Sequence, residues 1–241
     1  MRSIGHTHDV TPMNAHERLN AAKTSAREGR FAEALSEYIW FHEHALEEEP
    51  SLRGVRLSFA LGYWMELAGL YPQARAALQS IRDEKTRRLK DGAEDAELFI
   101  DVTAINRTLS NDEATYDLFC LINSRNPPLA GRCARVATPA IVKARDFKLA
   151  RGFIPDPEQA IEQLASGFNK GIERASRSST PERQIDITNA EVRIYADDVE
   201  LLIQIVGGAG EWKRADALAE HAVTLAGSSE MQVAVRSALG G

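Results

Sequence analysis

Cysteine, glycine and proline are all scarce in this chain of 241 residues. The two cysteines, Cys120 and Cys133, are too few for a disulfide framework and do not form a CxxC pair. We therefore expect two buried thiols in a reducing compartment. Sixteen glycines and nine prolines are also fewer than collagen-like or linker-like chains contain, which excludes both classes.

Long hydrophobic runs and a signal sequence are missing as well. The longest uncharged apolar runs extend from Leu57 to Met65 and from Leu201 to Gly210. A membrane-spanning helix needs about 20 such residues. Residues 1–8 contain no apolar core of the kind that a signal peptide has. We expect a soluble, cytoplasmic protein without a membrane partner.

An excess of positive charge is absent, since the formal net charge is −6. A nucleic-acid-binding protein usually presents a strongly basic face. Nucleic acid is therefore not the partner that the composition favours, and the net charge is ordinary for a soluble protein.

Motifs of catalysis and of metal or cofactor binding are also missing. The glycines of 207–210 lack the Lys-Ser/Thr pair that a phosphate-binding loop needs. His42 and His44 lie two residues apart, about 200° around a helix, so they cannot share a ligand. His6 and His8 offer two imidazoles where a closed zinc site needs four ligands. We expect no catalytic residue, no metal and no cofactor.

Alanine is abundant, with 35 residues, and it has the highest intrinsic helix propensity. Apolar residues recur three and four positions apart, as at Leu57, Ala60, Leu61 and Trp64. Both observations predict an all-α protein. Residues 185–206 are rich in β-branched side chains, but their length without a turn signal favours one long helix.

Helix start and stop signals accompany this periodicity. Asn14 opens a capping box with Glu17. Three pairs, Thr138-Pro139, Asp156-Pro157 and Thr180-Pro181, combine a capping side chain with proline at the first helical position. The stop signals are glycines that can adopt a left-handed conformation: Gly29, Gly69, Gly92, Gly152 and Gly210.

An internal repeat of the form Gly-x-aromatic-x-x-Ala occurs three times, at residues 29–34, 69–74 and 210–215. Its glycine ends one helix, its aromatic residue begins the next, and its alanine lets the two helices approach closely. Degenerate copies follow at Ser110–Ala114 and at Gly152-Phe153. The spacing is about 40 residues, with an insertion expected around residues 174–184.

These residues resemble the tetratricopeptide repeat, a pair of antiparallel helices. In the second copy, Leu61-Gly62 matches the Leu-Gly pair of the family's first helix, and Tyr71, Ala74 and Leu78 match the conserved positions of its second helix. The resemblance implies an all-α, right-handed superhelix of antiparallel helix pairs. We expect a flexible N-terminus over residues 1–13 and a single helical-repeat domain of about five helix pairs over residues 14–241.

The resemblance also implies a binding face, because the first helices of tetratricopeptide domains line a concave groove that holds peptides. Leu19 and Lys23 stand where the family's carboxylate clamp has Lys and Asn, so that clamp is not expected here. We expect a non-catalytic adaptor or scaffold that binds a protein or peptide, with self-association as an alternative. The candidate partner-binding residues are Asn20, Lys23, Arg27, Arg56 and Tyr63.

A basic stretch is the second candidate site. Residues 125–151 contain seven basic residues and one acidic residue, Asp146, within an acidic protein. The alternative function is therefore binding of an anionic small molecule or nucleic acid through Arg132, Arg135 and Lys143. An enzyme of unrecognised type is a further alternative, which would require a pocket with converging polar groups.

Overall fold

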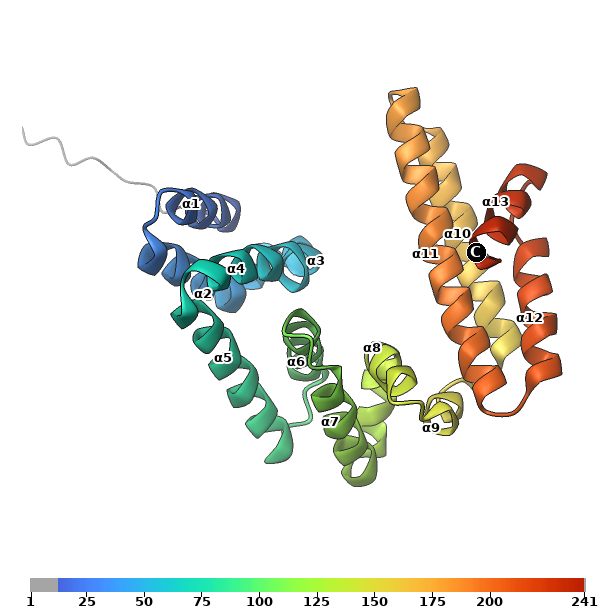
Figure 1. Ribbon diagram of the computed structural model, residues 1–241, viewed down its shortest axis with the longest axis horizontal. Coiled ribbons are helices and arrows are strands. Elements are labelled where there is room, and N and C mark those ends of the chain that lie inside the picture. Colours follow the sequence, from blue (N-terminus) through green and yellow to red (C-terminus); the bar gives the residue numbers. More distant parts are fainter. Residues whose placement is uncertain (1–12, 241) are drawn as a thin grey trace, which may run out of the picture. The chain divides into compact units, whose positions relative to one another are not determined.

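The computed structural model describes residues 13–240, of which none forms a β-strand. The protein is all-α, with 84% of its residues in helices (Figure 1). The chain divides into two compact units, Met1–Ile122 and Asn123–Gly241. A single domain over residues 14–241 stays a prediction, and the predicted flexible N-terminus lies outside the described residues except for Met13.

The helices of the first unit follow one another with short connections. They are α1 (Ala15–Arg27), α2 (Phe31–Glu48), a 3-10 turn (Pro50–Leu52), α3 (Arg53–Leu57), α4 (Phe59–Leu70), α5 (Pro72–Lys90), α6 (Ala96–Thr108) and α7 (Asp112–Arg125), whose last turn crosses the boundary. The second unit contains α8 (Pro127–Lys143), α9 (Phe147–Gly152), α10 (Pro157–Ser176), α11 (Pro181–Gly208), α12 (Trp212–Thr224) and α13 (Ser229–Leu239).

Three of the predicted helix starts are confirmed. Asn14 forms the full capping box with Glu17, and Asp156 and Thr180 accept backbone N–H groups at the starts of α10 and α11. The predicted start at Thr138-Pro139 is wrong. Helix α8 begins eleven residues earlier, at Pro127, and continues through Pro139. The Thr138 hydroxyl donates to the carbonyl of Ala134, so it bonds within the helix and does not cap a new one.

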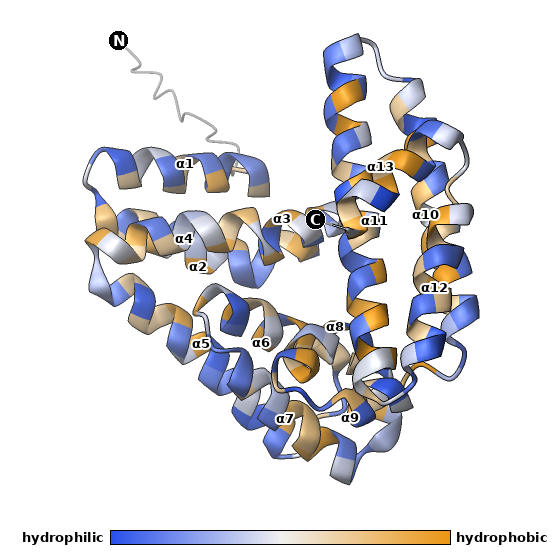
Figure 2. Cartoon of the chain, turned by 45° about the vertical axis from the view of Figure 1, so that its right-hand side comes forward, coloured by the Kyte–Doolittle hydropathy of each residue, from blue (hydrophilic) through white to orange (hydrophobic). Residues whose placement is uncertain are grey.

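The long helix expected over residues 185–206 is confirmed as α11, which has 28 residues. Along this helix, hydrophobic and hydrophilic residues alternate in bands (Figure 2).

The left-handed helix ends recur, but not always where the glycines predict them. Gly29, Gly92 and Gly210 have φ angles of 77°, 103° and 99°, as predicted. Ser110 and Arg145 adopt the same conformation, with φ angles of 58° and 62°. At all five ends, the next N–H bonds the carbonyl five residues earlier, as from Asn111 to Asn106. The same turn therefore recurs without glycine at two positions.

Two predicted turns are corrected. Gly69 lies inside the last turn of α4, and the chain turns at Tyr71, whose extended backbone leads into Pro72 at the start of α5. Gly152 is the last residue of α9, as its stop signal predicts, but the left-handed turn lies at Arg145, between α8 and α9.

The core of the first unit combines large side chains, such as Phe41 and Trp64, with close helix contacts at alanine. Ala22, Ala34 and Ala45 are fully buried between α1 and α2 and their neighbours. The indole N–H of Trp64 donates to the carbonyl of Ala74 at 2.8 Å, which joins α4 to α5. These contacts agree with the role expected for alanine in the repeat.

The core of the second unit surrounds α11, which packs against α8, α9, α10, α12 and α13. The rings of Phe168 and Tyr195 stack with centroids 4.7 Å apart, and the Tyr195 hydroxyl donates to the carbonyl of Ala222. At its C-terminal end α11 has no side chain at Gly208, where the ring of Phe147 fills the space. Within residues 13–240, no helix is both long and apolar enough to cross a bilayer.

Candidate functional site

Four of the five predicted partner-binding residues lie on a shared surface of the first unit. Asn20, Lys23 and Arg27 follow at helical spacing on α1, which packs against α4. The Lys23 ammonium lies 4.4 Å from the centroid of the Tyr63 ring, a cation–π contact. Phe59, one turn before Tyr63, is 66% exposed. The structure thus forms a cationic and aromatic surface there.

Arg56, the fifth residue, lies elsewhere. It is 6% exposed, and both of its terminal nitrogens reach the Asp101 carboxylate on α6. Arg56 also donates to the carbonyl of His42 at 3.0 Å. Lys85 on α5 is the second cation at Asp101. The prediction of Arg56 as an exposed groove residue is therefore corrected, because its charge is neutralised inside the unit.

The pKa values in this cluster reflect the charges that it buries. Burial, and then the positive charges of Arg56 and Lys85, lower the pKa of His42 to about 3, so the imidazole is neutral. Burial opposes ionisation of Asp101, but Arg56 and Lys85 outweigh it and hold its pKa below the usual value. The cluster fastens α2, α3, α5 and α6 together, and its buried groups face one another.

The basic stretch of the second unit is only partly available. Arg151 is held by Glu211, with Nε 2.7 Å from the carboxylate. The three predicted anion-binding residues, Arg132, Arg135 and Lys143, are all exposed on α8. Only Arg135 among these three lines a cavity.

That cavity is an open groove of about 790 Å³ within the second unit. One wall is α8, the other is the segment 153–156 with the first half of α10, and α11 contributes residues from 191 to 205. We call it the α8–α10 groove. Its apolar lining includes Phe153, Ile154, Leu164, Phe168, Ile194, Tyr195, Leu201, Leu202 and Ile205.

The exposure of Ile194 distinguishes this groove from ordinary surface. Ile194 is 54% exposed although it lies among other apolar side chains. Small residues on both walls, such as Ala134 and Gly167, leave the groove open. At Gly131 and Gly167 a Cβ atom would meet nothing within 4 Å. The groove therefore has room for side chains from outside the chain.

Asp198 and Arg135, two oppositely charged residues that line the groove, interact electrostatically. Burial raises the pKa of Asp198, the positive charge of Arg135 lowers it, and neighbouring Asp197 raises it again; the net direction is upward. Among the described residues, Asp198 makes no hydrogen bond or ion pair that would neutralise it. Its carboxylate is therefore available to accept a hydrogen bond.

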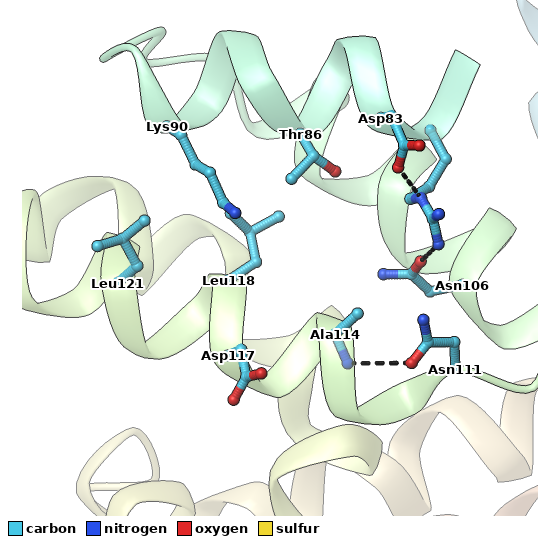
Figure 3. Close-up of a pocket in the computed structure, with 10 residues that line it drawn as sticks. Asp83, Thr86, Lys90, Asn106, Asn111, Ala114, Asp117, Leu118 and Leu121 are labelled. Atoms are coloured by element: carbon cyan, nitrogen blue, oxygen red, sulfur yellow. Dashed lines mark hydrogen bonds and ion pairs between the residues drawn. The ribbon is translucent and has the colours of Figure 1, made fainter. Parts of the chain in front are cut away.

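A second, smaller pocket of about 350 Å³ lies in the first unit between α5, the end of α6 and α7 (Figure 3). Asn106 is 1% exposed, accepts from Arg82 and donates to Thr115. Asn111 caps the start of α7 through the N–H of Ala114. These bonds connect three helices, so Asn106 and Asn111 have structural partners, whereas the hydroxyl of Thr86 in the same lining is buried without a hydrogen-bond partner among the described residues.

Sequence reasoning missed the groove, although one signal for it was present. The apolar spacing of residues 194–206 is less regular than that of the other helices. The structure explains the irregularity, because α11 is apolar on two sides: one side packs on α10, α12 and α13, and the other lines the groove.

No family model matches this chain. A search of curated proteins gives no similar sequence. Within residues 13–240, no three His, Cys, Asp or Glu residues gather as a metal site would require. The candidate site therefore stands on its own geometry.

Proposed function

We propose that this protein is a non-catalytic adaptor or scaffold that binds a segment of a protein partner in the α8–α10 groove. The observation that carries this proposal is the groove itself, an open channel between helices with a mainly apolar lining in which Ile194 is exposed above buried side chains such as Tyr195 and Leu202. Exposed apolar surface bordered by polar residues is typical of interaction sites.

We further propose that the helix pairs are degenerate tetratricopeptide-like repeats, and that each unit continues them in a right-handed sense. The recurring left-handed turns at Gly29, Ser110, Arg145 and Gly210 support this relationship. Repeat proteins commonly use such stacked helix pairs to bind partners. A fold alone does not determine a function, so the groove carries the functional proposal.

The experiment is a selection from a random peptide library displayed on phage, with the full chain immobilised. We expect enriched peptides whose affinity falls at least tenfold in the variant Ile194→Asp, because a carboxylate would enter the apolar lining. The matched control is Ile185→Asp. Ile185 lies on the same helix, is 59% exposed against 54% for Ile194, and is not part of the groove lining.

Binding that Ile185→Asp retains and Ile194→Asp loses supports the proposal. A selection that enriches no peptide, or enriched peptides that bind Ile194→Asp as well as wild type, overturns it.

A further inference from the structure

The charges along the α8–α10 groove are unequal. Its lining contains three carboxylates, of Asp156, Glu191 and Asp198, and one cation, Arg135. Asp156 already accepts the N–H of Gln159 as the cap of α10. Glu191 has a cation at 3.5 Å, but that partner, Arg174, is 72% exposed. The groove therefore has an excess of negative charge that the chain itself does not neutralise closely.

One backbone carbonyl of α8 also lacks its usual helical donor. Pro139 has no N–H, so the carbonyl of Arg135 lacks the donor that an α-helix normally supplies four residues later. Both residues belong to the stretch of α8 that lines the groove. The groove offers three carboxylates, which accept hydrogen bonds from a cationic partner.

The dimensions of the groove suit a helix. The lining residues of α11 extend from Glu191 to Ile205, about 21 Å at the rise of an α-helix. Gly131 on α8 and Gly167 on α10 have open space where a Cβ would stand. Small residues of this kind let another helix approach at the usual interaxial distance of about 8–10 Å. An incoming helix would pack against α11 between α8 and α10.

We propose that the occupant of the groove is an amphipathic helix of a partner protein, with an apolar face flanked by two basic residues about seven positions apart. Glu191 and Asp198 are seven residues apart on α11, which is about two helical turns or 10.5 Å, and this spacing sets the spacing of the cations. This inference rests on the function proposed above and specifies the chemistry of the partner.

Two synthetic peptides of 14 residues test the inference. One combines leucine with lysine at helical spacing and has two lysines seven residues apart; the other has glutamate in place of lysine. Binding to the full chain is measured by fluorescence anisotropy at physiological salt, where long-range attraction to an acidic protein is largely screened. We expect the Leu/Lys peptide to bind at least tenfold more tightly than the Leu/Glu peptide.

The variant Asp198→Asn should weaken the Leu/Lys peptide by up to about fivefold. Its control is Asp197→Asn, which removes the same charge one residue away and outside the groove lining. A third variant, Gly167→Leu, fills the groove while raising helix propensity. We expect it to lose the peptide and to keep or gain thermal stability, so a loss of binding there does not arise from unfolding.

Equal effects of Asp198→Asn and Asp197→Asn, or undiminished binding to Gly167→Leu, overturn the inference. If the Leu/Glu peptide binds as tightly as the Leu/Lys peptide and Gly167→Leu abolishes the binding of both, the partner helix is not basic, but the proposed function of the groove stands. If neither synthetic peptide binds and the phage selection also fails, the proposed function falls as well.

Discussion

The buried pair of Arg56 and Asp101 leads to a prediction about the stability of the first unit. The two side chains are 7% and 6% exposed, and Lys85 adds a second cation at the same carboxylate. Replacing Asp101 with Asn keeps the volume but leaves Arg56 buried without its counter-ion. Its nearest ring neighbour, His42, is neutral and offers no compensating charge.

Breaking a buried pair by removing one partner costs about 3–5 kcal/mol. A matched exposed pair joins the same two helices: Arg53 on α3 and Glu97 on α6 lie 2.6 Å apart, with side chains 44% and 55% exposed. An exposed pair contributes about 0–1 kcal/mol. We therefore expect Asp101→Asn to cost several times more than Glu97→Gln, although both remove one carboxylate from α6.

Urea unfolding of the full chain at pH 7 measures the difference, with the fluorescence of buried Trp64 reporting on the first unit. At a typical urea dependence of about 1.5–2 kcal/mol per M, Asp101→Asn should lower the midpoint by about 2 M. Glu97→Gln should lower it by less than about 0.5 M. If the two variants unfold at the same urea concentration, the buried pair does not stabilise the unit as argued.

Three further predictions concern single positions. The pKa of His42 is lowered to about 3 in the folded protein, so the unfolded chain takes up the imidazole proton first as the pH falls. The free energy of unfolding is therefore highest above pH 6.5 and decreases toward pH 3, by up to about 1.4 kcal/mol per pH unit. His42→Asn should make the free energy of unfolding less dependent on pH in urea titrations between pH 6.5 and 4. If the variant and the wild type lose stability in parallel, His42 is not the source of the dependence. Arg145→Gly should raise the free energy of unfolding by about 1 kcal/mol, because glycine adopts φ of 62° without strain, and a lower melting temperature would argue against the turn geometry. Gly208→Ala should cost about 1–3 kcal/mol, since its Cβ would overlap the Phe147 ring, whereas Gly210→Ala, tested beside it, meets no neighbouring atom and is strained only by its φ of 99°. If adding Phe147→Leu to the Gly208→Ala variant does not restore stability, the Phe147 ring is not the cause of the loss.

The features that sequence predicts well are those determined by neighbouring residues. Asn14 and Asp156 cap helices because the N–H groups they bond lie three residues further on. Thr138-Pro139 has the same local pattern, yet the surrounding contacts of α8 keep the helix intact through the proline. A single Thr-Pro pair is thus insufficient to end a helix that buries apolar residues on both sides of it.

The features that sequence misses depend on residues far apart in the chain. Arg56 looks like a surface cation until Asp101, 45 residues later, is seen to neutralise it. Arg145 carries no signal for a left-handed turn, and Ser110 carries only that of the repeat spacing, because the preference for glycine there is energetic and not absolute. The α8–α10 groove is lined by three helices, and the irregular apolar spacing within α11 alone does not locate the walls that α8 and α10 provide.

The central position of α11 also has a consequence for the order in which the chain folds during synthesis. In the first unit, α1 pairs with α2 and α4 with α5, so each pair finds its partner soon after it is made. In the second unit, α8, α9 and α10 all make contacts with α11, which is completed only at Gly208. Local contacts form quickly and distant ones wait for the chain between them. During synthesis we expect the first unit to fold helix pair by helix pair as it emerges from the ribosome. In the second unit we expect the apolar faces of α8, α9 and α10 to stay exposed until α11 emerges and packs against them.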